Sequence, residues 1–239
     1  MRRFALSVAV VAVTLTAAPF ASAKIPDNVA AAARDADRHP AEITALTGVK
    51  PGDRVVDVGP GRTGYYTRIF SRVVGDKGKV YMFNPTWVAE KFPKALEAPA
   101  AFQAAGYKNV EGSVQPMAEI KFDAPVDLIF VSQLYHDQVW QKIDVAKMNK
   151  AIFDALKPGG VYFIIDHTGP GVTTPEQIDK VHRIEPSLVK EQILAAGFKL
   201  ESESALLRNA ADPKTANVFD PAIRGKTDQF VYKFVKPAK

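Results

Sequence analysis

Cysteine is absent from the 239 residues, and the sequence contains no run of basic residues. The absence of cysteine excludes disulfide bridges, thiol nucleophiles and zinc–thiolate sites. Because the formal net charge of +5 is spread along the chain, it gives no reason to expect nucleic-acid binding. Histidine is scarce, with four residues, and internal repeats and low-complexity tracts are missing. This composition predicts a globular protein that depends on its hydrophobic core for stability.

The first residues have the pattern of a secretory signal peptide. Arg2 and Arg3 precede an apolar run over residues 4–18, and Ala21-Ser-Ala23 provides a small-x-small cleavage site. We predict cleavage after Ala23 and export, to a periplasm, of a mature chain that makes no membrane contact. Removal of the two arginines lowers the formal charge from +5 to +3. A retained membrane anchor is the alternative, but the apolar run is shorter than the ~20 residues of a membrane span.

The mature chain, residues 24–239, is predicted to form a single α/β domain that begins with helices in residues 24–50. Apolar runs typical of buried parallel strands then alternate with helical segments. The predicted strands are residues 54–58, 79–83, 109–114, 126–132, 161–166, 198–206 and 229–235. The predicted helices include residues 65–74, part of 86–105, 139–156 and 186–196.

This order predicts a Rossmann-like, doubly wound, mostly parallel sheet of seven strands, with helices on both faces. No helical pattern separates the last two strands, so the last strand is expected to run antiparallel. The start of that strand then lies at the edge where the parallel strands end. Residues 208–227 are therefore predicted to be a loop that caps the ligand-binding edge of the sheet.

A glycine-rich turn joins the first predicted strand to a helix. Gly59, Gly61 and Gly64 follow Asp57, which ends the strand. Glycines let the main chain approach a ligand closely, and the first N–H groups of the helix then point at that ligand. An ordinary tight turn is the alternative. We predict a nucleotide-type cofactor site at this turn.

Several motifs resemble those of class I S-adenosylmethionine-dependent methyltransferases. Val55-Val-Asp-Val-Gly-Pro-Gly61 is similar to the first cofactor motif of that family, and Leu156-Lys-Pro-Gly-Gly-Val161 to its turn before the fifth strand. Ala195-Ala-Gly-Phe198 is similar to its turn before the sixth strand. The pairs at 136–137 and 166–167 and the segments 207–212 and 224–228 resemble a group of exported bacterial proteins called predicted methyltransferases. The resemblance implies S-adenosyl-L-methionine as the cofactor.

The resemblance also implies which residues bind this cofactor, namely Asp57, Gly59, Gly61, Gly64, Tyr66, Asn84 and Ser113. Tyr66 is expected against the adenosine and Ser113 at the adenine edge. A buried aromatic face of the first helix and an ordinary turn serine are the alternatives. The glycine loop is one residue longer than in the family. Asn84 stands where the family has an acid that accepts both ribose hydroxyls, and its amide oxygen accepts only one such bond well.

Two carboxylate–histidine pairs follow neighbouring strands. His136 and Asp137 come after residues 126–132, and Asp166 and His167 end the next strand. Because ligands bind beyond the carboxyl ends of parallel strands, these side chains are expected to face one pocket. We predict that His136 takes a proton from the methyl acceptor, that Asp137 or Asp166 orients it, and that His167 belongs to the same catalytic group. Helix capping by Asp137 and a structural His136 are the alternative.

His182, Arg183 and Arg208 are predicted to bind the substrate, because they lie in a lid-like segment and in the capping loop. Solvated surface arginines are the alternative. Histidine and carboxylate side chains also suit a metal ion. However, no two histidines have the close spacing of a metal-binding helix, so the sequence assigns no metal ligands and a metal site depends on tertiary convergence.

The predicted function is methyl transfer from S-adenosyl-L-methionine to a small-molecule acceptor. One alternative is an exported small-molecule binding protein that keeps the fold without methyl transfer, which Asn84 and the longer glycine loop favour. The other is a metal-assisted hydrolase or lyase that uses the histidines. The sequence carries no signature of a particular acceptor or oligomeric state.

Overall fold

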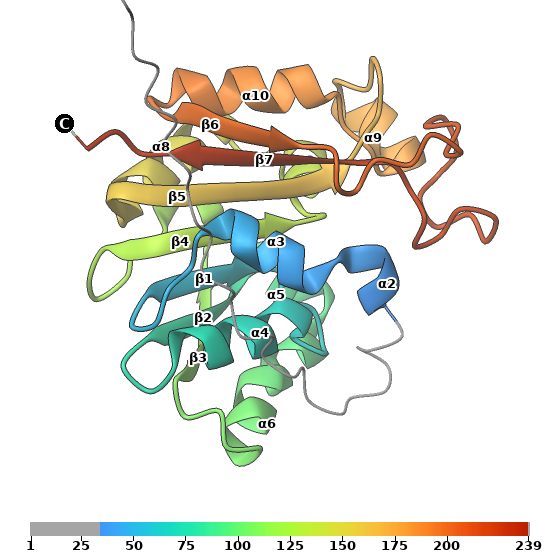
Figure 1. Cartoon of the computed structure of the whole chain (residues 1–239). Helices are drawn as coiled ribbons and strands as arrows, with labels where there is room; N and C mark the ends of the chain where they lie inside the picture. The colour runs from blue at the N-terminus through green and yellow to red at the C-terminus, as the bar shows by residue number, and fades with distance from the viewer. Residues whose placement is uncertain (1–33, 239) are drawn as a thin grey trace, which may run out of the picture.

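The protein is described from a computed structural model, of which residues 34–238 are described, so the predicted signal peptide and residues 24–33 of the predicted N-terminal helices lie outside the described residues. Seven strands form one sheet with the order β3-β2-β1-β4-β5-β7-β6 (Figure 1). The strands are β1 (Arg54–Val58), β2 (Lys79–Pro85), β3 (Val110–Gln115), β4 (Val126–Ser132), β5 (Leu156–His167), β6 (Lys199–Ser204) and β7 (Gln229–Val235). Only β7 runs against its neighbours, pairing antiparallel with β5 and β6. The predicted fold class is confirmed.

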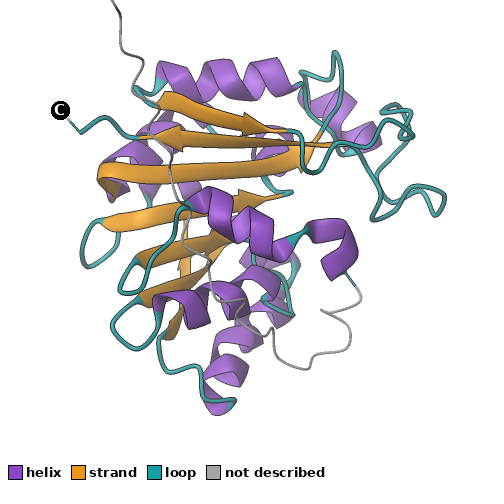
Figure 2. Cartoon of the chain, in the orientation of Figure 1, coloured by secondary structure: helices purple, strands orange, loops and turns teal. Residues whose placement is uncertain are grey.

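Helices cover both faces of this sheet (Figure 2). They are α2 (Asp35–Arg38), α3 (Pro40–Thr47), α4 (Tyr65–Val74), α5 (Thr86–Lys91), α6 (Ala98–Ala104), α7 (Tyr135–Trp140), α8 (Val145–Ala155), α9 (Pro175–Val181) and α10 (Pro186–Ala195), with 3-10 turns η1 (Pro93–Glu97) and η2 (Met117–Glu119). Successive side chains of a strand point to opposite faces. In β4, Leu128 and Phe130 accordingly join the core under α3, α4 and α6, whereas Ile129 and Val131 join the core under α8, α9 and α10.

Several predicted bounds change in the structure. The helix predicted at 139–156 is two helices, because Lys142 adopts a positive φ of 57° and Asp144 caps α8 by accepting a bond from the Lys147 N–H. Residues 86–105 divide into α5, η1 and α6, with Pro93 at the start of η1. β5 begins at Leu156 rather than at 161, because Leu156 pairs with Val126. Helix α9 was not predicted, although its capping box is visible in the sequence.

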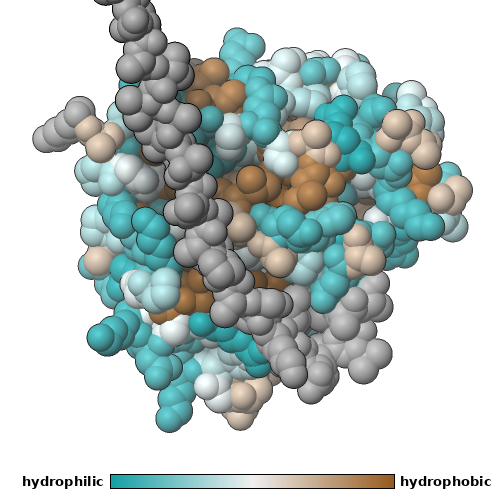
Figure 3. Space-filling model, viewed as in Figure 1, coloured by the Kyte–Doolittle hydropathy of each residue, from teal (hydrophilic) through white to brown (hydrophobic). Residues whose placement is uncertain are grey.

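The carboxyl ends of the parallel strands meet at one edge, on the right in Figure 1, where residues 205–228 also lie. This segment forms turns without a helix or strand, in agreement with a loop at the ligand edge. Its contacts with the rest of the protein include a pair of bonds between Arg183 and Asp212. The face shown in Figure 3 is mostly hydrophilic, with apolar patches between polar side chains. Among residues 34–238, no helix has the length and apolar character needed to cross a bilayer.

Candidate functional site

The glycine loop between β1 and α4 requires glycine at three positions. Gly59, Gly61 and Gly64 have φ values of 64°, 67° and 53°, which residues with a side chain rarely adopt. A Cβ atom on Gly59 would lie 2.5 Å from Cδ2 of Leu134, whereas one on Gly61 would meet nothing within 4 Å. The loop therefore packs closely on Leu134 at one glycine and presents bare main chain to open space at another.

Asp57 is buried at the end of β1 and accepts a 2.6 Å hydrogen bond from the Thr67 hydroxyl. The donor, Thr67, belongs to the first turn of α4. Burial raises the pKa of Asp57 to about 6, although the bonds from Thr67 and the charge of Arg38 oppose this shift. Ionisation of Asp57 is therefore less favourable in the folded protein than in water.

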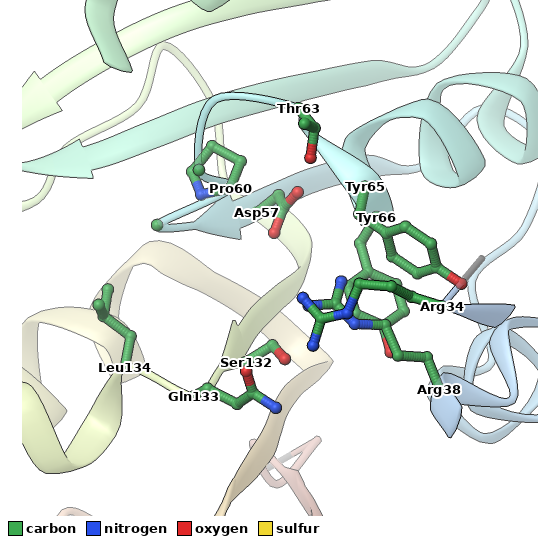
Figure 4. A pocket seen from close by; sticks show the side chains of 12 residues that line it. Arg34, Arg38, Asp57, Pro60, Thr63, Tyr65, Tyr66, Ser132, Gln133 and Leu134 are labelled. Carbon is green, nitrogen blue, oxygen red and sulfur yellow. The ribbon is translucent and has the colours of Figure 1, made fainter. Parts of the chain in front are cut away.

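A pocket of about 300 Å³ opens beside Asp57, and we call it the arginine pocket. Its lining consists of Arg34, Arg38, Asp57, Gly59, Pro60, Gly61, Thr63, Tyr65, Tyr66, Ser132, Gln133 and Leu134. Figure 4 shows the guanidinium groups of Arg34 and Arg38 reaching into it between Asp57 and Gln133. Arg38 also lies 4.5 Å from the centre of the Tyr65 ring. Sequence reasoning missed both arginines, although residues four apart share one helix face.

A second cavity of about 470 Å³, the histidine cavity, lies next to the arginine pocket. Its lining is mainly apolar and consists of Gly59, Gly61, Arg62, Asn84, Trp87, Val88, Phe92, Ala95, Gln133, Leu134, His136, Asp137, Trp140, His167, His182, Val218 and Phe219. Four of these residues, Gly59, Gly61, Gln133 and Leu134, line the arginine pocket too. The fold thus brings two predicted glycines and five predicted polar residues to one cavity.

Three predicted cofactor residues have different surroundings. Asn84, at the end of β2, is 2% exposed, and its Oδ1 atom accepts no hydrogen bond from residues 34–238. Tyr66 lines the arginine pocket but packs its ring on Phe130, with centroids 4.6 Å apart. Ser113 accepts a 3.0 Å bond from Gln115 and lies outside the linings of both cavities. A buried acceptor without a donor, as in Asn84, fits a ligand hydroxyl.

His136 and Asp166 form a buried pair. The Nδ1 atom of His136 lies 2.7 Å from Oδ1 of Asp166, and the His136 main-chain N–H donates to Oδ2 at 2.9 Å. Asp166 also accepts the main-chain N–H of His167. Burial disfavours a charged imidazole, but the attraction of Asp166 and its hydrogen bond outweigh burial and raise the pKa of His136 to about 8. Asp166 therefore fixes both the position and the orientation of this ring.

The other two histidines of the cavity differ in character. Nδ1 of His167 lies 2.7 Å from the Thr227 hydroxyl, and burial lowers the pKa of His167 to about 3, so this ring is neutral. His182 follows α9 with φ 50° and ψ 50°, and its Nδ1 lies 3.6 Å from Oδ1 of Asp137. The same carboxylate oxygen lies 3.3 Å from Nε2 of His136. One oxygen of Asp137 thus faces two imidazole nitrogens.

The two arginines predicted to bind substrate lie elsewhere. Arg183 is fully buried, and its guanidinium donates to both oxygens of Asp212, at 2.8 and 2.9 Å, and to the carbonyl of Ala216 at 2.8 Å. Arg208 contacts Asp228 at 3.1 Å. Neither arginine lines the arginine pocket or the histidine cavity. Because Arg183 uses its donors within the fold, we assign it a structural role in place of the predicted substrate contact.

Known proteins match both the sequence and the fold. Residues 21–165 match the family of protein-L-isoaspartate(D-aspartate) O-methyltransferases. The ubiquinone/menaquinone biosynthesis C-methyltransferase UbiE of Teredinibacter turnerae is 30% identical over 132 residues, which are 52% of this chain and 47% of that relative. The chain therefore spans less than half the length of this curated relative.

Solved structures share the fold at lower identity. An S-adenosylmethionine-dependent methyltransferase from Aquifex aeolicus superposes with a TM-score of 0.58 and 24% identity, over 82% of this chain and 88% of that one. The N-methyltransferase NodS from Bradyrhizobium japonicum gives a TM-score of 0.57 and 10% identity, over 89% and 99%.

The family match favours a methyltransferase over the binding-protein and hydrolase alternatives. Folds of this class host many reactions, so the structural likeness alone does not establish the chemistry. The sequence match covers the glycine loop, β1 to β4 and β5 up to residue 165. The chain belongs to the protein-L-isoaspartate(D-aspartate) O-methyltransferase family.

Proposed function

We propose that the protein methylates a small acceptor with an apolar body and an ionisable hydroxyl or amino group, bound in the histidine cavity. The main support is the wall that this cavity shares with the arginine pocket. Gly59, Gly61, Gln133 and Leu134 line both spaces. A donor bound along the glycine loop therefore borders an acceptor in the histidine cavity, as methyl transfer requires of two aligned reactants.

The arginine pocket suits the amino-acid end of the cofactor. Arg34 and Arg38 offer guanidinium groups to a carboxylate, and the nearby Asp57 offers a carboxylate to an ammonium group. Asn84 offers its unpaired oxygen to a ribose hydroxyl. The bound cofactor supplies a methyl group that its sulfonium makes electrophilic. The chain's own task is to hold the acceptor in line and to assist the loss of its proton.

The acceptor class follows from the lining of the histidine cavity. Trp87, Trp140, Phe92 and Phe219 provide apolar walls, with Phe92 59% and Phe219 56% exposed, which fits an apolar molecule. The family match ends at residue 165, so His167, His182 and Phe219 lie beyond it. The apolar lining of the cavity therefore supports an acceptor with an apolar body.

We assign activation of the acceptor to His136, Asp137 and His182. These side chains are the polar cluster of an otherwise mainly apolar cavity. Asp166 positions His136 through its Nδ1 atom and leaves Nε2 facing Asp137. Neutral His167, held by Thr227, forms part of the wall.

Titration calorimetry with S-adenosylmethionine and its demethylated product tests cofactor binding. Both of the chain's tryptophans line the histidine cavity, so an acceptor that enters the cavity is expected to quench their fluorescence. This signal can be used to screen small phenols and amines as acceptors.

Once an acceptor is identified, we expect His136→Ala to lower turnover at least ~100-fold while cofactor affinity is kept. The matched control is His39→Ala, since His39 lines neither cavity. Undiminished turnover in His136→Ala would remove this cluster from the reaction.

We also propose that the enzyme acts after export, on the support of the signal-peptide pattern of residues 1–23. N-terminal sequencing of the protein from its host is then expected to start at Lys24. Material that begins at Met1 and sediments with membranes would show a retained anchor instead.

A further inference from the structure

We propose that His136, Asp137 and His182 bind one divalent transition-metal ion at the acceptor end of the histidine cavity. The inference deepens the proposed function and rests on it, because it specifies how the polar cluster holds the acceptor. The sequence alone does not predict this site, since the ligands come from α7 and from the residue that follows α9.

The geometry of the three side chains suits a metal ion. One potential ligand atom from each lies within 4.8 Å of the others. Oδ1 of Asp137 lies 3.3 Å from Nε2 of His136 and 3.6 Å from Nδ1 of His182, and both distances exceed an ordinary N–H···O hydrogen bond. A tetrahedral ion with bonds of about 2.1 Å spaces its ligand atoms about 3.4 Å apart. The observed separations match this spacing.

Asp166 supplies the support that metal-binding histidines usually have. Histidine ligands commonly donate their second ring N–H to a carboxylate, which fixes the tautomer and the direction of the ring. Nδ1 of His136 lies 2.7 Å from the fully buried Asp166, so Nε2 is left as the ligand atom. The main-chain N–H of His136 donates to the same carboxylate. The ring is therefore held in the orientation a metal needs, even without the ion.

The surroundings of His182 support the same conclusion. Its ring meets Trp140 and Phe219 edge to face, at centroid distances of 5.2 and 5.0 Å, so apolar walls flank the cluster. A divalent charge balances the two carboxylates of Asp137 and Asp166, and among the described residues that line the cavity Arg62 is the one other charged residue. Three protein ligands leave a coordination position open, as in catalytic rather than structural sites. Two imidazoles and a carboxylate suit zinc or iron(II).

The test uses the untagged full-length chain, freed of metal by a chelator and titrated with Zn²⁺ and with Co²⁺. We expect one equivalent of either ion to bind and the Co²⁺ form to show visible absorption bands. His182→Ala and the isosteric Asp137→Asn should each weaken binding at least tenfold, and Asp166→Asn should weaken it about 10- to 100-fold. His39→Ala is the control, because its side chain is 40% exposed and pairs with Glu42 away from the cavity.

Two results would overturn the proposal. One is a metal-free wild type that takes up no Zn²⁺, and the other is equal affinity in wild type, His182→Ala and Asp137→Asn when circular dichroism shows all three folded. Calorimetry with S-adenosylmethionine on the metal-free chain separates this inference from the proposed function. If the chain binds the cofactor but no metal, the metal site alone is disproved. If it binds a metal but not the cofactor, the proposed methyl-transfer function is disproved.

Discussion

Asn84 is a buried amide at the end of β2 whose Oδ1 atom accepts no bond within the described residues. We predict that Asn84→Asp tightens binding of S-adenosylmethionine by about 1–2 kcal/mol, roughly tenfold, because a carboxylate accepts ribose hydroxyls more strongly than an amide. Calorimetry measures the change, and the demethylated product should gain equally since it has the same ribose. Asn84→Ala, the matched control, should weaken both. Unchanged or weaker binding by Asn84→Asp would contradict the ribose contact.

For Asp57 we predict an effect of pH on the free energy of unfolding. Burial raises its pKa in the folded protein to about 6, above the ordinary value of 3.8, so between these values the folded state binds more protons than the unfolded state. The free energy of unfolding should therefore fall as pH rises from about 4 to 6, by about 3 kcal/mol for this group. Asp57→Asn keeps an acceptor for Thr67 without the charge. Urea unfolding between pH 4 and 7 should show a smaller decrease in this variant, and parallel curves would refute the assignment.

For single residues, the sequence predicts well which side chains lie together at the ends of the strands. Asn84, His136 and His167 lie at or just after the ends of three separate strands, and the topology of parallel strands was enough to expect them at one edge. Arg34 and Arg38 were missed because their role depends on how α2 folds back over the glycine loop. The burial of Arg183 was equally hidden, since its partner Asp212 is 29 residues away and no local pattern joins them.

Helix α9 has a complete capping box, in which Thr174 accepts the Gln177 N–H and the Gln177 side chain accepts the Thr174 N–H. We predict that Thr174→Ala lowers the free energy of unfolding by about 1 kcal/mol, because helix donors lose their partner. Thr215→Ala, at an exposed loop position, should change it by less than about 0.5 kcal/mol. Denaturant titration compares the two. Equal effects of the two substitutions would show that the capping box adds nothing to stability. His182 of the histidine cavity directly follows this helix.

Elements with one strong hydrophobic pattern were predicted with the bounds that the structure has, and β1, β4, β7 and α4 agree residue for residue. Their apolar residues recur with the period of their own backbone, so local sequence and burial agree. The 139–156 segment was predicted as one helix because helical residues lie on both sides of a short break. The break contains Lys142, whose positive φ no sequence pattern required, and it ends at Asp144, which caps α8.

The whole molecule joins a regular sheet to an irregular cap. The central strands of the sheet are apolar runs, whereas residues 205–228 form turns that are joined to the rest of the domain by contacts between residues distant in sequence. Thr227 bonds His167, and Asp228 accepts the main-chain N–H of Asn209. Val218 and Phe219 from this segment line the histidine cavity. The shape of the acceptor side therefore depends on contacts between residues far apart in the chain.

Arg183 and Asp212 form the buried link between this cap and the rest of the domain, and both side chains are fully buried. We predict that Asp212→Asn lowers the free energy of unfolding by about 3–5 kcal/mol, because it leaves the guanidinium charge buried without its partner. Lys150→Gln is the control. It removes an exposed pair with Asp154 four residues away on α8, worth about 0.3–0.5 kcal/mol. Denaturant titration gives both values, and hydrogen exchange should show faster exchange in residues 205–228 of Asp212→Asn alone. A loss no larger than that of the control would mean that other contacts, such as those of the buried Val218, hold the segment without the ion pair.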